Sequence, residues 1–148
     1  MAKFIYRMQN ILDIKLKLES QAKIAYSQAN AALREEEAKL LKLFERKNAY
    51  DNRAKELVEG KIDLLEIKKC RQAIESMKVL IRRQMMQVQV AEKNVAAARQ
   101  KLEEVMKERK TQEKLREKDF EDFKQQLAQE DNKVVDELVS YSYGRPKK

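Results

Sequence analysis

Apolar side chains recur at alternating steps of three and four residues along most of this chain, and one glycine near the middle interrupts the repeat. Before Gly60 the repeat occupies Ala22, Tyr26, Ala29, Leu33, Glu36, Leu40, Leu43, Lys47, Tyr50, Ala54 and Leu57. After it the repeat occupies Ile67, Cys70, Ile74, Met77, Ile81, Gln84, Val88, Ala91, Val95, Ala98, Leu102 and Val105. This spacing predicts two coiled-coil seams, each with a few polar interruptions.

The short segment 59–63 separates the two seams and predicts a tight turn. Glycine readily adopts the left-handed conformation that ends a helix, which is the role we expect for Gly60. Asp63 then has the character of an N-cap, with Glu66 at the capping-box position. A helix end followed at once by a helix start predicts two antiparallel helices. The expected fold is therefore all-α, a single helical hairpin over residues 1–148, with helices at about 4–58 and 64–141 and a tail at 142–148.

Composition supports this fold and limits the function. Charged residues make up 39% of the chain and apolar residues 43%, and the apolar residues are regularly spaced, which disordered chains lack. The net charge of +8 lies mainly in the second helix, in clusters such as Lys68-Lys69 with Arg71 and Arg82-Arg83. Acidic residues interrupt these clusters, so a solvated surface is the first interpretation and an acidic partner the second. Nucleic acid is disfavoured because no base-reading element is present.

The two predicted helices can be aligned with each other. Folding at the glycine pairs positions whose numbers sum to about 121, which places Tyr50 opposite Cys70 and Ala73, and Leu40 opposite Ile81. The large Tyr50 then faces small residues, as interdigitated packing requires. A parallel dimer gives no reason for these matches, so we expect a monomeric hairpin.

The same register predicts that the second helix continues beyond the first. Near Val105-Met106 the repeat shifts by one residue, and Phe4 is expected to reach only to about residue 117. The helix beyond that point would have no intramolecular partner. Its apolar residues are Phe120, Phe123, Leu127, Val134, Val135, Leu138, Val139, Tyr141 and Tyr143. An unpaired apolar stripe of this kind predicts a binding surface, with fraying or self-pairing of the tail as the alternative.

Catalytic and membrane-spanning features are absent from the sequence. Histidine, the commonest acid–base residue and metal ligand, does not occur, and no Gly-rich phosphate loop is present. The lone Cys70 lies on a seam and fits a reducing compartment. No signal peptide or long apolar run is recognisable. We expect a cytoplasmic protein that is not an enzyme, with no cofactor, metal or small-molecule substrate.

Several short stretches carry a family resemblance. The opening Phe4-x-Tyr6-x-Met8-Gln9-x-Ile11-Leu12-Asp13, the turn near residue 60, the stretch Lys114-Leu115-Arg116-Glu117-Lys118 and the later Asp136-Glu137 resemble FliJ, a soluble component of the flagellar type III export apparatus. The resemblance covers nearly the whole chain. It implies an antiparallel coiled coil similar to the central stalk of rotary ATPases.

The resemblance also implies partners and sites. FliJ proteins insert into the ring of the export ATPase FliI and promote its assembly, contact the cytoplasmic domain of the export gate FlhA, and recycle export chaperones at the inner face of the membrane. The gate surface would match Lys39, Leu43, Arg46, Tyr50, Ala73, Met77, Leu80 and Gln84, although Arg46 and Ala73 stand where the family commonly has aromatics. The stalk tip would match Phe4, Met8, Phe120, Phe123, Leu127, Val134 and Leu138.

Leu43, Tyr50 and Met77 also lie on the predicted seams, so burial in the core is the competing interpretation for them, whereas Leu80 lies off the seam. Three alternative functions stay open: the equivalent stalk of a virulence secretion system, a prefoldin-like holdase and a structural coiled-coil dimer. A prefoldin-like holdase needs β-strands at the hairpin turn, and the five residues around Gly60 cannot supply them.

Overall fold

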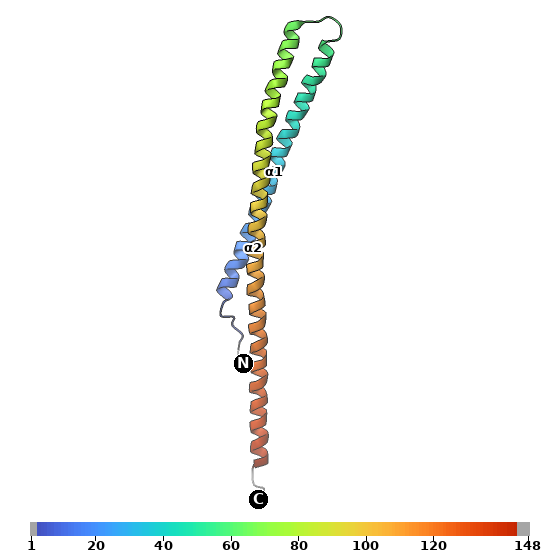
Figure 1. Ribbon diagram of the computed structural model, residues 1–148. Coiled ribbons are helices and arrows are strands. Elements are labelled where there is room, and N and C mark those ends of the chain that lie inside the picture. Colours follow the sequence, from blue (N-terminus) through green and yellow to red (C-terminus); the bar gives the residue numbers. More distant parts are fainter. Residues whose placement is uncertain (1–2, 145–148) are drawn as a thin grey trace. The chain divides into compact units, whose positions relative to one another are not determined.

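The computed structural model describes residues 3–144 of the chain, with side chains to residue 141. Within these residues there are two helices and no strand. Helix α1 spans Gln9–Leu57 and α2 spans Leu64–Gly144. They pack against each other as a hairpin (Figure 1), which confirms the predicted all-α fold and the longer second helix. Helix α2 ends at Gly144, close to the predicted end near Tyr141, and the predicted basic tail at Lys147-Lys148 lies outside the described residues.

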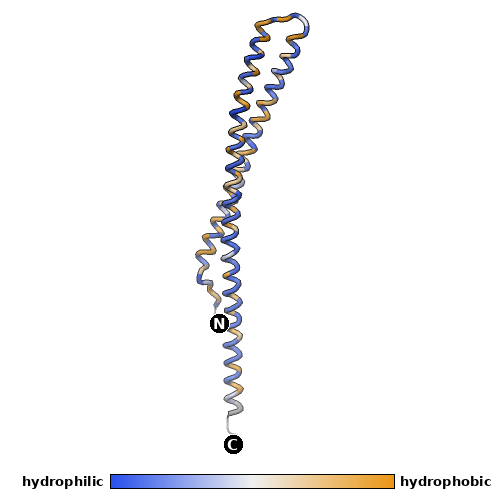
Figure 2. The backbone as a smooth tube through the Cα atoms, in the orientation of Figure 1, coloured by the Kyte–Doolittle hydropathy of each residue, from blue (hydrophilic) through white to orange (hydrophobic). Residues whose placement is uncertain are grey.

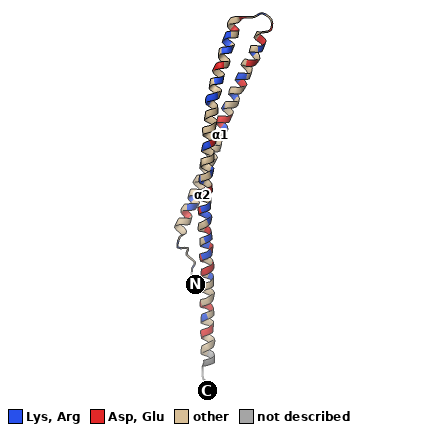
Figure 3. Cartoon of the chain, viewed as in Figure 1, with Lys and Arg blue, Asp and Glu red and all other residues tan. Residues whose placement is uncertain are grey.

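The contacts divide the chain into two compact units. The first, here called the turn unit, is Gln21–Glu103 and contains the end of α1, the turn and the start of α2. The second, the terminal unit, contains the described residues before Gln21 and after Glu103. Apolar and hydrophilic residues alternate along both helices (Figure 2), as a seam with two solvated flanks requires. Acidic and basic residues are interspersed along the same helices (Figure 3).

The turn forms where the sequence predicts it. Gly60 has a φ of 85°, in the left-handed region that an L side chain rarely adopts. Asp63 caps α2, since its Oδ1 accepts a hydrogen bond from the backbone N–H of Leu65 at 3.0 Å and lies 3.5 Å from that of Glu66. The Glu66 side chain forms ion pairs instead of closing the capping box, at 3.9 Å from Lys69 and 3.8 Å from Arg53.

Every predicted seam position in the turn unit is buried or half-buried. The buried ones are Ala22, Cys70, Met77, Ile81, Val88, Ala91 and Val95. The polar interruptions find partners across or along the seam. The Gln84 amide donates to the carbonyl oxygen of Glu36 at 2.9 Å and also to its carboxylate, and Lys47 bonds Asp51 at 2.9 Å. These polar groups therefore keep hydrogen-bond partners although they lie on the seam.

The predicted register holds closely in the turn unit. The Cys70 thiol donates to the backbone carbonyl of Tyr50 at 3.3 Å, and Gln84 lies opposite Glu36. Both pairs fall within one residue of the predicted sum of about 121. Small residues opposite Tyr50 thus allow the two helices to approach at this level.

The terminal unit corrects the predicted start of the first helix. Helix α1 begins at Gln9 rather than near Phe4, and residues 3–6 are not helical. The Tyr6 side chain is buried, and its hydroxyl donates to Gln112 Oε1 at 3.0 Å. A non-helical chain advances about 3.3 Å per residue against 1.5 Å in a helix, so this segment reaches further along α2 than a helical turn would.

The Phe4 ring consequently lies against Phe120 and Phe123, with centroid separations of 5.0 and 5.4 Å. The guanidinium of Arg116 lies 5.7 Å from the Phe4 ring centroid. The expectation that Phe4 reaches only residue 117, and that Phe120 and Phe123 have no intramolecular partner, was therefore wrong. The stretch in which every described side chain is exposed begins after the half-buried Leu127 and runs from 128 to 141.

A buried ion pair lies at the start of the terminal unit. Glu19 is 6% exposed, and its carboxylate accepts hydrogen bonds from Arg109 Nε at 2.7 Å and Nη2 at 3.2 Å. Glu113 holds the remaining side of the same guanidinium at 2.9 Å. These hydrogen bonds raise the pKa of Arg109 above its usual value. On either side of Arg109, two adjacent residues of α2 are both at least half-buried, Val105 with Met106 and Gln112 with Glu113, as expected where the repeat shifts by one residue.

Candidate partner-binding surfaces

The residues matched to the gate surface all lie in the turn unit and differ widely in exposure. Met77 is 3% exposed and belongs to the core, whereas Leu80 is 39% exposed. Lys39 and Arg46 are exposed as well. Leu43, Tyr50, Ala73 and Gln84 are half-buried. The outward-facing part of this surface is therefore Leu80 with the two basic residues of α1.

A small cleft opens beside these residues, with a volume of about 130 Å³. It is lined by Tyr50, Arg53, Glu66, Lys69, Cys70 and Ala73. Tyr50 and Ala73 are among the residues matched to the gate surface. The three charged lining residues are not among the matched residues. In the sequence each of them directly precedes a seam position, which is the signal that places them on this flank. The Arg53–Glu66 pair at 3.8 Å links α1 to α2 across this cleft.

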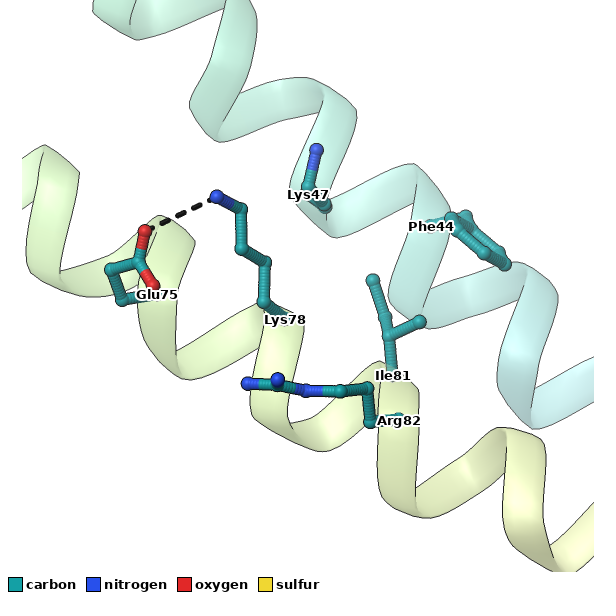
Figure 4. Close-up of a pocket in the computed structure, with 6 residues that line it drawn as sticks. All are labelled: Phe44, Lys47, Glu75, Lys78, Ile81 and Arg82. Atoms are coloured by element: carbon teal, nitrogen blue, oxygen red, sulfur yellow. Dashed lines mark hydrogen bonds and ion pairs between the residues drawn. The ribbon is translucent and has the colours of Figure 1, made fainter.

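A second and larger groove lies along the other edge of the same seam (Figure 4). Its lining residues are Phe44, Lys47, Glu75, Lys78, Ile81 and Arg82, and its volume is about 440 Å³. None of these residues is among those matched to a partner. The signal in the sequence that could have indicated this groove is Phe44. It directly follows the seam position Leu43, where a solvated flank usually has a polar residue.

The residues matched to the stalk tip lie in the terminal unit and fall into two groups. Phe4, Phe120 and Phe123 form the aromatic cluster described above, with Met8 38% exposed nearby in the chain. Val134 and Leu138 are 55% and 62% exposed and lie in the stretch beyond Leu127. In the first group Phe4 packs against two aromatic rings of α2, and the second group presents apolar surface to solvent.

A tyrosine and an arginine side chain add an electrostatic contact in the turn unit. Arg99 donates to the Tyr26 hydroxyl at 3.3 Å, and its guanidinium carbon lies 5.9 Å from the ring centroid. The hydrogen bond from Arg99, and a weaker one from Asn30, lower the pKa of Tyr26 below its usual value. Tyr26 is half-buried on the seam and Arg99 is exposed beside it.

The described part of the chain contains neither a group of side chains that could hold a metal ion nor a helix that could span a membrane. Among residues 3–144 no cluster of three or more histidine, cysteine or carboxylate side chains could hold a metal ion. Neither α1 nor α2, over the same residues, contains an apolar stretch sufficient to cross a bilayer. The free thiol of Cys70 is buried in the seam and bonded to a carbonyl.

These observations define a class of protein before they define a family. A charged two-helix hairpin with open clefts on its flanks and an exposed apolar stripe on its longer helix is the architecture of an interaction protein. The family model described as flagellar FliJ protein matches residues 4–148, and the chain belongs to the FliJ family. Its membership associates it with the flagellar export apparatus. No curated protein and no solved structure matches the chain.

Proposed function

We propose that this chain is a non-enzymatic stalk of the flagellar type III export apparatus, which binds the FliI-like ATPase ring through its terminal unit and the FlhA-like gate through its turn unit. Membership of the FliJ family supports the export role. The single observation that carries the ring-binding part is the exposed apolar stripe of α2 beyond Leu127.

The stripe has the spacing of a helix that binds in a groove. Val134, Leu138 and Tyr141 recur at steps of four and three, and Val135 and Val139 lie beside them. All five are at least 46% exposed. Exposed apolar side chains that cluster in this number commonly mark a surface that binds another molecule. Insertion of this stripe into the centre of the ATPase ring would bury it and favour the assembled ring, since a ligand that binds only the assembled state stabilises that state.

The gate-binding part rests on the turn unit. Leu80 projects an apolar side chain between α2 residues that face solvent, and Lys39 and Arg46 add positive charge on α1. An interface with an apolar centre and a charged rim has this composition. The same hairpin would carry the recycling of export chaperones, and the protein would work as a monomer in the cytoplasm, at the inner face of the membrane below the flagellum.

The test is ATP hydrolysis by the cognate export ATPase, measured with the full chain and with a chain ending at Ala128. The shorter chain keeps Phe120 and Phe123, and with them the aromatic cluster around Phe4. We expect stimulation by the full chain that the shorter chain loses. Val134→Ser with Leu138→Ser in the full chain should lose it too, and Asn132→Ser, at another exposed position of the same helix, should keep it.

Full stimulation by the shorter chain would refute the stalk tip at residues 129–141. If the full chain, folded and helical, stimulates nothing, the ATPase role itself is refuted. Binding of the isolated gate domain to Leu80→Ala then tests the other half of the proposal. Weaker binding with unchanged helicity supports the gate surface, and unchanged binding contradicts it.

A further inference from the structure

We infer that the groove lined by Phe44, Ile81 and Arg82 is a second docking surface of the turn unit, which binds an acidic peptide segment through an apolar side chain flanked by carboxylates. Figure 4 shows Ile81 directed from α2 toward α1, with Phe44 and Lys47 opposite it and Lys78 and Arg82 on the near side. The groove has an apolar centre and a basic border.

The apolar centre is large enough for one side chain. Ile81 is 6% exposed and forms the floor, and Phe44 is 40% exposed, so much of its ring is in water. The groove volume of about 440 Å³ exceeds that of any single side chain and remains open to solvent. Covering an exposed aromatic ring with an apolar side chain removes apolar area from water, which is the main favourable term of association.

The border carries a positive charge that the protein does not neutralise. The one carboxylate among the lining residues, Glu75, is paired with Lys78 at 3.2 Å, and the lining residue Lys47 is paired with Asp51 at 2.9 Å. Arg82 has no ion pair or hydrogen bond with the described residues. A free guanidinium at the edge of an apolar groove binds a carboxylate well, because its planar donors match the carboxylate oxygens.

Two further cations extend this border along α2. Lys68 and Arg71 occupy the same heptad positions as Glu75 and Lys78, one heptad earlier, and both are exposed. Neither forms an ion pair with a described residue. A partner that runs antiparallel or parallel to α2 would meet positive charge on both sides of the apolar centre. The complementary partner is therefore a peptide with carboxylates on both sides of its apolar residue.

This groove is distinct from the surface assigned to the gate. Phe44 and Lys78 directly follow seam positions, Leu43 and Met77, whereas Arg46 and Leu80 directly precede the seam positions Lys47 and Ile81. In an antiparallel coiled coil these two sets lie on opposite sides of the seam. A partner in the groove and a partner on Leu80 would therefore bind opposite flanks of the turn unit.

The experiment uses the full chain and a fluorescent peptide with a central leucine and glutamates on both sides, measured by fluorescence anisotropy. We expect binding that weakens with salt and is lost when glutamine replaces the glutamates. Arg82→Gln should weaken binding about tenfold, the usual effect of losing one charged hydrogen bond. Phe44→Ala should weaken it at least about fivefold, as for an interface anchor.

Leu80→Ala is the matched control, because Leu80 is 39% exposed on the opposite flank and Phe44 is 40% exposed in the groove. It should leave peptide binding unchanged, and circular dichroism should show equal helicity in all variants. No binding by the wild-type chain overturns the proposal. Equal binding of the glutamate and glutamine peptides also overturns it, as does a loss of peptide binding in Leu80→Ala equal to that in Phe44→Ala. Tighter binding of an oligonucleotide than of the peptide, or self-association of the chain that Arg82→Gln abolishes, would assign the groove to another partner and overturns it as well.

Discussion

Replacing Met77 with alanine separates the two interpretations of the residues matched to the gate surface. Met77 is 3% exposed, and its truncation removes buried methylene and sulfur contacts from the seam. Large-to-small changes of this kind cost about 2–5 kcal/mol of unfolding free energy. The seam is only one layer deep, and the neighbouring position Ile74 is half-buried, so solvent and side chains refill part of the space. We therefore expect a cost at the lower end, about 2 kcal/mol.

The matched change is Leu80→Ala, three residues further along α2. Leu80 is 39% exposed, so truncation removes contacts that are already partly with water, and we expect a cost below about 1 kcal/mol. Urea unfolding followed by circular dichroism gives both values, and an unchanged slope with urea shows that the variants compare the same folded and unfolded states. In a domain of this size the first change should lower the melting temperature by about 4–8 °C.

The reasoning is refuted if Met77→Ala costs less than about 0.5 kcal/mol, the range of an ordinary surface substitution. It is also refuted if Leu80→Ala costs as much as Met77→Ala. At a temperature where both variants are folded, only Leu80→Ala should weaken binding to the gate domain. An equal loss in both would place Met77 at the interface despite its burial.

Three further predictions test the turn, the terminal unit and a surface contact. Gly60→Ala should lower the unfolding free energy by about 1–2 kcal/mol, because a φ of 85° is unfavourable for alanine. The cost would come from the backbone alone, since no neighbouring side chain or backbone lies within 4 Å of the added Cβ. Urea unfolding measures this cost, and a neutral effect would contradict the left-handed turn. Glu19→Gln should lower the melting temperature more than Glu113→Gln. Both carboxylates bind Arg109, but the Glu19 side chain is buried and the Glu113 side chain is 43% exposed. Equal shifts in melting temperature would argue against a buried ion pair. Tyr26 should ionise at lower pH than an ordinary tyrosine, because its pKa in the folded chain is lowered. The wild-type chain should therefore gain stability relative to Tyr26→Phe as the pH rises from the folded pKa toward the unfolded value near 10, and should lose that gain as the pH falls back. Ultraviolet titration checks the pKa, and unfolding measured at each pH checks the stability.

The seams and the turn could be predicted because both depend on local sequence. A repeat of three and four residues fixes which side of a helix is buried, and every predicted seam position of the turn unit is buried or half-buried. Gly60 and Asp63 act through their own backbone and side-chain chemistry, and both have the predicted roles. The pairing of Tyr50 with Cys70 followed from the position of the turn alone.

The start of the first helix could not be predicted from the same periodicity. Phe4, Met8 and Leu12 fit helical spacing, but residues 4 to 6 form a short apolar run, which is also compatible with an extended segment. Phe4 is half-buried, Ile5 is 80% exposed and Tyr6 is 4% exposed. The contact of Phe4 with Phe120 decides between the two patterns, and it depends on a residue far away in the sequence. Tertiary packing overrode local propensity there.

The groove was missed for a different reason. A seam pattern identifies the residues that are buried between the two helices. It does not show which residues of the two flanks form a groove, so only the chemistry of single residues is informative there. Phe44 and Arg82 each fit an ordinary helix surface when considered alone. They line one groove because the register places Phe44 of α1 beside Ile81 and Arg82 of α2, and residues on the seam fix that register.

The stretch of α2 beyond Leu127 is helical although its described side chains are all exposed, and the reason it stays helical bears on how it binds. Nucleating an isolated helix is costly, but adding residues to an existing helix is close to neutral for good helix formers. The packed part of α2, with Phe120 and Phe123 against Phe4, supplies that nucleus. A partner that binds Val134 and Leu138 therefore meets a helix already formed, and little ordering entropy opposes the burial of its apolar stripe.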